Sequence, residues 1–240
     1  MGPLVESVRM PLKESNRPSG HGRAGAPARV LVVDDHPIAR RGLIDLLEGE
    51  LGLEIAGEAG DGASALELIE REHPDLVLID ISLQGANGID LIKEIRARGD
   101  GVRMLVASMH DEAIYADRAL RAGAMGYVNK EAPVAQFVEA VTQVLEGNLY
   151  LSRGASETAL RRRVGVAGQE ERSPLERLSD RELEVFSLIG DGLTTREIAK
   201  RLGLSPKTIE THRENIKDKL DLKNATQLVS AAVRWRAETS

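Results

Sequence analysis

The chain has 240 residues, a length that allows one large domain or two ordinary ones. With 42% hydrophobic and 29% charged residues, its composition is that of a globular protein. No stretch approaches the length of an apolar membrane span and no apolar segment opens the chain, so we expect no membrane helix and no secretory signal. The absence of cysteine excludes disulfides and thiolate metal sites, which suits a cytoplasmic protein.

Charge is distributed unevenly along the chain. Residues 28–150 carry 11 Lys and Arg against 22 Asp and Glu, a net charge of −11. Residues 174–240 carry 12 against 11, a net charge of +1. An acidic half followed by a nearly neutral half predicts two domains with different partners.

The first 27 residues are rich in Gly, Pro and Ser and have no hydrophobic period, so we expect residues 1–27 to be a disordered leader. After them, apolar runs alternate with amphipathic segments. The expected strands are 29–34, 53–59, 75–80, 102–108 and 126–129. The expected helices are 37–48, 63–72, 88–98, 112–122 and 134–146. Five such units predict an α/β domain over residues 28–150, with a doubly wound, five-stranded parallel sheet.

Residues 151–173 are expected to be a linker, and residues 174–240 show four helical patterns and no strand, which predicts a second, all-α domain. Helix starts are marked by a capping box at Ser179, a threonine at 194 or 195, and Ser205 before a proline. A short helix, a turn at Gly203 and a second helix form the helix-turn-helix pattern. A small helical bundle for protein contacts is the alternative.

Polar residues lie at the ends of four of the five expected strands, at the edge where parallel sheets carry their chemistry. Asp34 and Asp35 lie at the end of the first strand, Asp80 ends the third, Ser108 ends the fourth and Lys130 follows the fifth. Each alone has a structural explanation, such as helix capping or a solvated lysine. Together, three acids, one hydroxyl and one amine from four segments indicate a functional site.

Across residues 29–148 the chain resembles a response-regulator receiver domain, in the motifs LVVDDHP, VLIDISLQGANG, VAS and GYVNK. The resemblance implies a flavodoxin-like fold in which Asp80 is the phosphoacceptor. It implies Mg²⁺ as the cofactor, with these ligands: Asp34, Asp35, Asp80 and the main-chain carbonyl of Ser82. It also makes Ser108 and Lys130 the phosphoryl contacts, and Tyr127 the switch aromatic that swings inward on phosphorylation.

The residue types suit this chemistry. Closely packed carboxylates repel one another unless a cation lies among them, and Mg²⁺ prefers oxygen ligands. Phosphoryl transfer needs a nucleophile, here Asp80, and neutralisation of charge by Mg²⁺, an ammonium and a hydroxyl. His36 follows the acid pair, and we expect it to be a helix N-terminal residue beside Pro37 rather than a metal ligand.

Residues 175–236 resemble the LuxR-type DNA-binding domain, in the motifs DRE, GLTTREIAKRL, SPKTIETH and IKDKL. In the second helix of the motif, Ile209, Ile216 and Leu220 are expected to pack inward. The positions expected to contact bases or phosphates are Lys207, Thr208, Glu210, Thr211, His212, Arg213, Glu214, Lys217 and Lys219. Residues 196–223 have a net charge of only +3, so the motif carries this expectation rather than a basic patch.

The last helical pattern, 226–235, has an apolar stripe with small residues. We expect Val229 and Ala232 to form a dimer face, as the resemblance also implies. Leu228 and Val233 are assigned equally to the domain's own core and to a partner.

The two resemblances together are those of a two-component response regulator of the NarL/FixJ type. We expect a sensor histidine kinase to phosphorylate Asp80, and a homodimer formed on activation to bind double-stranded promoter DNA in the cytoplasm, with no membrane partner and no enzymatic turnover. One alternative is the same fold working unphosphorylated through a protein partner. Another is a magnesium-dependent aspartyl phosphatase, although that class commonly has an acid where this chain has Ser82.

Overall fold

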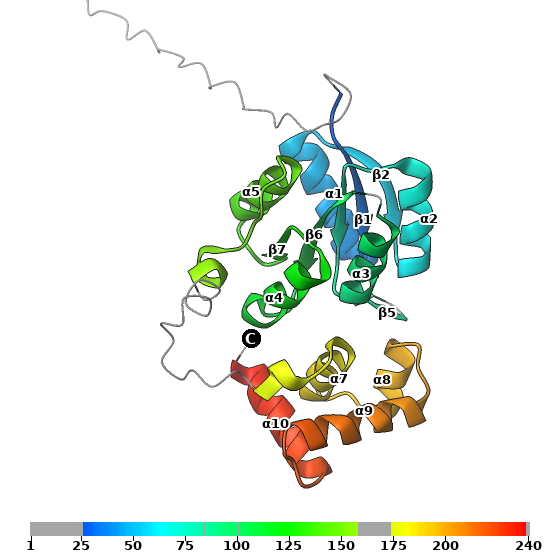
Figure 1. Cartoon of the computed structure of the whole chain (residues 1–240), viewed down its shortest axis with the longest axis vertical. Coiled ribbons are helices and arrows are strands. Elements are labelled where there is room, and N and C mark those ends of the chain that lie inside the picture. The colour runs from blue at the N-terminus through cyan, green and yellow to red at the C-terminus, as the bar shows by residue number, and fades with distance from the viewer. Residues whose placement is uncertain (1–25, 84, 100, 158–173, 239–240) are drawn as a thin grey trace, which may run out of the picture.

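The computed structural model describes residues 26–83, 85–99, 101–157 and 174–238 (Figure 1). Most of the expected leader, 1–27, lies outside the described residues, and the expected linker, 151–173, is described only as far as residue 157. Within the described part of the chain, no helix is long and apolar enough to cross a membrane.

The first domain is built on a five-stranded parallel sheet with the order β2-β1-β3-β6-β7. Its strands are β1 (Arg29–Val33), β2 (Glu54–Ala59), β3 (Leu76–Ile79), β6 (Arg103–Ser108) and β7 (Gly126–Asn129). Each strand lies within one residue of its expected bounds. The order reverses between β1 and β3, which is the crevice where open α/β sheets place their sites.

Helices cover both faces of this sheet (Figure 1). They are α1 (Pro37–Leu51), α2 (Gly62–Glu72), α3 (Gly88–Arg98), α4 (Glu112–Ala122) and α5 (Val134–Leu145). Because side chains alternate along a strand, Val30 and Val32 of β1 enter the core under α1 and α5, whereas Leu31 and Val33 enter the core under α2, α3 and α4. The doubly wound α/β prediction is confirmed.

Two short features of this domain were not expected from the sequence. A two-stranded antiparallel hairpin, β4 (Ser82–Leu83) and β5 (Ala86–Asn87), follows β3 directly. Tyr150 lies beside Gly126 and adds a bridge to the free edge of β7. Elements of one or two residues are too short to show a hydrophobic period, so no sequence pattern could indicate them.

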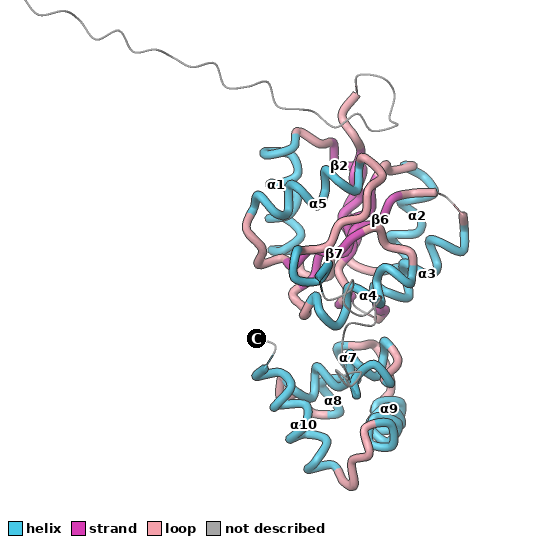
Figure 2. Tube along the Cα trace, turned by 60° about the vertical axis from the view of Figure 1, so that its left-hand side comes forward, coloured by secondary structure: helices cyan, strands magenta, loops and turns pink. Residues whose placement is uncertain are grey.

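The second domain is all-helical, as expected (Figure 2). It contains a 3₁₀ turn, η1 (Pro174–Arg177), and the helices α7 (Asp180–Gly190), α8 (Thr195–Arg201), α9 (Pro206–Lys219) and α10 (Ala225–Glu238). Ser179 and Thr194 each form a capping box, and the Ser205 hydroxyl accepts from the amide of Thr208. The three helix starts predicted from capping residues are therefore confirmed.

The packing of α7 on α10 corrects one expectation. Ala232 is fully buried, because α10 crosses α7 at Gly190, where an added side-chain carbon would lie 2.7 Å from the carbonyl oxygen of Ala232. Ala232 is therefore not available as a partner face, contrary to the expectation from the sequence. Leu228 is also buried, whereas Val229 and Val233 are 42% and 47% exposed.

Gly88 provides a test of how tightly α3 is held under the sheet edge. A side-chain carbon at this position would lie 2.1 Å from the main-chain oxygen of Asp80, so Gly88→Ala must displace the backbone around Asp80. We expect Gly88→Ala to destabilise the domain by about 2 kcal/mol or more, at the upper end of overpacking costs. Chemical denaturation measures the change in the free energy of unfolding.

Gly42→Ala is the matched control, since Gly42 lies in α1 with no atom within 4 Å of the added carbon. It should raise stability by about 0.4–1 kcal/mol through lower entropy of the unfolded chain. Equal stability of the two variants would show that a side-chain carbon at position 88 does not clash with the backbone around Asp80.

Candidate functional site

Three carboxylates meet at the carboxyl edge of the sheet because the backbone ladder continues just past the strands. The amide of Asp34 donates to the carbonyl of Ala59 at 3.0 Å, and the amide of Asp80 donates to the carbonyl of Val33 at 2.8 Å. These bonds hold Asp34 and Asp80 side by side, and both are buried, with 0% and 5% exposure. Asp35 is partly exposed at the mouth of the same site.

Lys130 supplies positive charge to this cluster. Its Nζ lies 2.7 Å from Oδ2 of Asp34 and 2.9 Å from Oδ2 of Asp80. The amide of Lys130 donates to the carbonyl of Ser108, which extends the pairing of β6 with β7 by one residue. One ammonium thus bridges two acids from different strands. The three residues meet at one edge of the sheet, as predicted from their places at the strand ends.

The site retains an excess of negative charge. Burial raises the pKa of Asp80, although Lys130 opposes the rise, and two acidic neighbours add to it. Burial also raises the pKa of Asp35, against the opposing effect of His36. Raised pKa values of two neighbouring carboxyl groups indicate a site that a cation would stabilise.

The donor set fits a magnesium ion. Ligand atoms of Asp34, Asp35, His36 and Asp80 lie within 4.8 Å of one another. Oδ1 of Asp80 is buried and has no hydrogen-bond partner in the described part of the chain, which leaves this oxygen for an ion or a phosphoryl group. The three carboxylates offer oxygen ligands of the kind that Mg²⁺ prefers.

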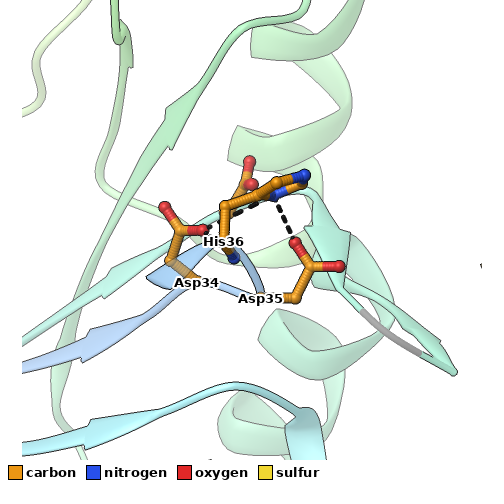
Figure 3. Close-up of side chains that lie close together, drawn as sticks. Asp34, Asp35 and His36 are labelled. Carbon is orange, nitrogen blue, oxygen red and sulfur yellow. Dashed lines mark hydrogen bonds and ion pairs between the residues drawn. The ribbon is translucent and has the colours of Figure 1, made fainter. Parts of the chain in front are cut away.

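His36 takes the position expected of it at the start of α1. It is the N-cap residue before Pro37, and its amide donates to Oδ1 of Asp34 at 2.7 Å. Its side chain is 55% exposed, with Nδ1 2.6 Å from Oδ1 of Asp35 (Figure 3). The ring therefore pairs with one of the acids at the rim of the cluster.

The residues expected to form the switch converge on His110. Oγ of Ser108, which is fully buried, accepts from the amide of His110 at 3.3 Å. The Tyr127 hydroxyl donates to the carbonyl of His110 at 2.7 Å, and Oγ of Ser82 lies 2.9 Å from its Nε2. Burial lowers the pKa of His110 to about 4, so the ring is neutral at pH 7.

The side chain of Tyr127, the expected switch aromatic, is fully buried. Its hydroxyl donates to the carbonyl of His110, so the buried phenol has a hydrogen-bond partner. A swing of this ring on phosphorylation stays a prediction.

The C-terminal domain is docked against this edge of the first domain (Figure 2). Asp180, at the start of α7, accepts from Lys93 of α3 and from Arg118 of α4, each at 2.8 Å. Arg118 also donates to the carbonyl of Leu175. Burial opposes ionisation of Asp180, but the two cations outweigh it, so its pKa is lowered.

A second polar contact lies deeper in the same interface. Nδ2 of Asn87, in β5, donates to Glu184 of α7 at 3.1 Å, and Arg181 also pairs with Glu184 at 2.8 Å. Burial raises the pKa of Glu184 despite these partners. An acid this deeply covered is held by hydrogen bonds from both domains, so domain separation would return it to water.

The two domains enclose a cavity of only about 10 Å³, room for about one water molecule. Its lining comes from both domains: Asp35, Ser82, Leu83, His110, Glu184, Leu188, Arg201 and Leu202. Residues of α7 and α8 therefore lie close to Asp35 at the mouth of the carboxylate site.

The interface residues were not predicted from the sequence. Asp180 follows an N-cap serine and has the pattern of an ordinary acid in a first helical turn. Its partners Lys93 and Arg118 lie 87 and 62 positions earlier, with no motif to connect them. Only the folded arrangement shows this pairing.

The expected DNA-contacting residues lie on α9, with different surroundings. Lys207, Glu210, Thr211 and Glu214 are exposed, and Ile209 and Ile216 are buried beneath them as predicted. Side chains with partners inside the domain are Thr208 with Ser205, Arg213 with Glu210, Lys217 with Glu214, and Lys219 with Glu182. Burial lowers the pKa of His212, which disfavours the charged form of its ring.

Comparisons with known proteins agree with both domains. Residues 30–142 match the response regulator receiver domain, and residues 176–232 match the bacterial regulatory proteins of the luxR family. The transcriptional activator protein ExaE of Pseudomonas putida is 38% identical over 206 residues, which cover 85% of this chain and 95% of that protein. The nitrate/nitrite response regulator protein NarP of Escherichia coli is 33% identical and is covered to 91%, with 82% of this chain.

A solved structure extends the comparison to both domains together. RcsB of Salmonella enterica serovar Typhimurium, bound to the promoter P1flhDC in the presence of the phosphomimetic BeF3−, is 26% identical with a TM-score of 0.60. The match covers 86% of this chain and 98% of that one. The chain therefore belongs to the two-component response regulators of the NarL type, transcription regulators that join a receiver domain to a LuxR-type DNA-binding domain.

Proposed function

We propose that this protein is a DNA-binding transcription regulator controlled by phosphorylation of Asp80. The observation that carries the proposal is the surroundings of this carboxylate. Oδ2 is fixed by Lys130, while Oδ1 is buried and has no hydrogen-bond partner among the described residues. A fixed carboxylate with one oxygen left over is suited to act as a nucleophile.

The other site residues have roles that follow from their positions. Asp34, Asp35, Asp80 and the main-chain carbonyl of Ser82 would hold Mg²⁺, which neutralises charge on phosphoryl oxygens when bound. Asp80 attacks the phosphorus of a phosphohistidine on a sensor kinase, or of a small phosphodonor, and the donor's leaving group departs in line. Lys130 and the Ser108 hydroxyl then stabilise the new phosphoryl oxygens.

The output is binding of promoter DNA by the C-terminal domain, which places the protein in the cytoplasm. The relative bound to its promoter supports this for the fold, and α9 presents Lys207, Glu210, Thr211 and Glu214 to solvent. Phosphorylation would free the C-terminal domain from the receiver and favour a homodimer, with 151–173 as the tether. A dimer gains affinity over one recognition helix through effective concentration.

An aspartyl phosphatase is less well supported by the site. That chemistry commonly uses an acid two residues after the nucleophile, and here Ser82 has its hydroxyl bonded to His110. The position therefore holds no general acid for turnover.

The acceptor is tested by labelling with acetyl phosphate or phosphoramidate in the presence of Mg²⁺. Intact-mass spectrometry should show one added phosphoryl group on the wild type. Asp80→Asn should abolish the addition, because an amide is not an anionic nucleophile. Asp117→Asn, at an exposed acid of α4, is the control and should label like the wild type. A label that survives in Asp80→Asn at equal stoichiometry would place the acceptor elsewhere.

The dimer face is assigned to the exposed side of α10. Val229 and Val233 line a shallow groove, whose residues are Ala225, Thr226, Val229, Ser230, Val233 and Arg234. With Ala232 turned into the core, Val233 replaces it as the second apolar contact of this face.

Sedimentation equilibrium tests this assignment, because it measures the dissociation constant of the dimer and does not require the operator sequence. With Mg²⁺ and beryllofluoride the wild type should form dimers, whereas Val229→Glu should weaken association at least tenfold, because a charge would be buried. Its Asp80 should still accept a phosphoryl group normally. Leu149→Glu, at a 70% exposed position of the receiver, is the control and should dimerise. Dimers of Val229→Glu with wild-type affinity would show that another face is used.

A further inference from the structure

We propose that His110 is the positioning residue through which the phosphoacceptor site holds the C-terminal domain in its docked place and releases it. The inference rests on the proposed function of Asp80 and assigns the link between that site and the domain interface to one side chain. The role is one of positioning, because the ring touches residues around Asp80 rather than the reacting atoms.

On one side, His110 is bonded to three residues of the phosphoacceptor site. Its Nε2 lies 2.9 Å from Oγ of Ser82, two residues past Asp80. Its amide donates to Oγ of Ser108, and its carbonyl accepts from the Tyr127 hydroxyl. A shift of any of these three residues therefore acts directly on His110.

On the other side, the ring of His110 belongs to the domain interface. It stacks on Tyr115 of α4, with ring centroids 4.7 Å apart and planes inclined by 27°. Tyr115 is 1% exposed and lies one helical turn before Arg118, which holds Asp180 of the C-terminal domain. The position of the ring thus supports the part of α4 that contacts α7.

His110 also faces the C-terminal domain across the small cavity between the domains. The residues of the C-terminal domain that line this cavity with it are Glu184 and Leu188 of α7, Arg201 of α8 and Leu202, the residue that caps α8. Because the cavity admits about one water molecule, the wall that His110 forms has little freedom to move while the domains stay docked.

These contacts give a physical route for the signal. When Oγ of Ser108 turns toward a phosphoryl group on Asp80, it leaves the amide of His110, and the 108–110 loop loses one of its fixed points. The ring then shifts against Tyr115 and against the cavity wall, which weakens docking. Coupling is reciprocal, so docking should in turn hold Ser108 away from the phosphoryl position and disfavour phosphorylation.

The chain has no cysteine, so a labelled pair can report docking in the full-length protein. Spin labels at Glu67→Cys and Asn215→Cys occupy exposed positions, one on α2 and one on α9. Pulsed electron–electron double resonance measures the distance between the two labels. It should give a narrow distance distribution for the docked state and a broad one for the released state. Each variant is measured without beryllofluoride and with beryllofluoride plus Mg²⁺.

His110→Ala should raise the released fraction about 5-fold or more without beryllofluoride, the lower end of typical coupling between two sites. Adding beryllofluoride should then change the distribution little. Met109→Ala is the matched control, since this neighbour in the same loop is 54% exposed, and it should behave like the wild type. A distribution for His110→Ala that equals the wild type under both conditions would overturn the inference.

His110→Phe keeps a ring of similar size in the buried site and protects the test against misfolding of the alanine variant. It retains packing on Tyr115 and the backbone bonds to Ser108 and Tyr127 through which the signal passes, so it should stay docked without beryllofluoride and be released by it as the wild type is. A released fraction without beryllofluoride as high as that of His110→Ala would overturn the inference. Failure of the wild type to label at Asp80 would instead contradict the proposed function, and the measurements without beryllofluoride would still judge the role of His110.

Discussion

Repulsion among Asp34, Asp35 and Asp80 at one sheet edge is the constraint on which the rest of the receiver depends. Two unit charges about 4 Å apart interact by about 4 kcal/mol at the effective dielectric of a protein surface. The fold opposes this repulsion with Lys130, which reaches two of the acids, and with backbone bonds that fix the strand ends. The remaining imbalance makes the edge responsive, because a cation or a phosphoryl group changes the charge that the neighbouring loops experience.

The parts of the structure that were predicted from the sequence are those with local causes. Alternating apolar runs gave the five strands, and Ser179, Thr194 and Ser205 marked helix starts because a cap acts within three residues. Ala232 could not be placed this way, since an apolar stripe does not show which of its edges meets another helix. The close approach at Gly190 decides that, and it is visible only in the fold.

The docked arrangement restrains the C-terminal domain without covering the outer side of α9, the second helix of its helix-turn-helix motif. Among the described residues, η1 and α7 accept hydrogen bonds from the receiver and α8 lines the small cavity beside it, whereas Glu210, Thr211 and Glu214 of α9 are exposed. Under the proposed function, control therefore depends on where the C-terminal domain is held and on association through α10, rather than on covering α9. The interface that holds the domain combines the ion pairs of Asp180 with apolar contacts, and Asp180 and His110 both lie in it.

One apolar cluster runs from the sheet through Tyr115 and Ala119 of α4 to Leu175 and Leu183 of the C-terminal domain. Separation of the domains would expose part of this cluster to water, so docking has a negative change in heat capacity. Hydrophobic contacts weaken on cooling, whereas the ion pairs of Asp180 do not depend on that term. The balance between held and released domains should therefore respond to temperature as well as to changes at the carboxylate site.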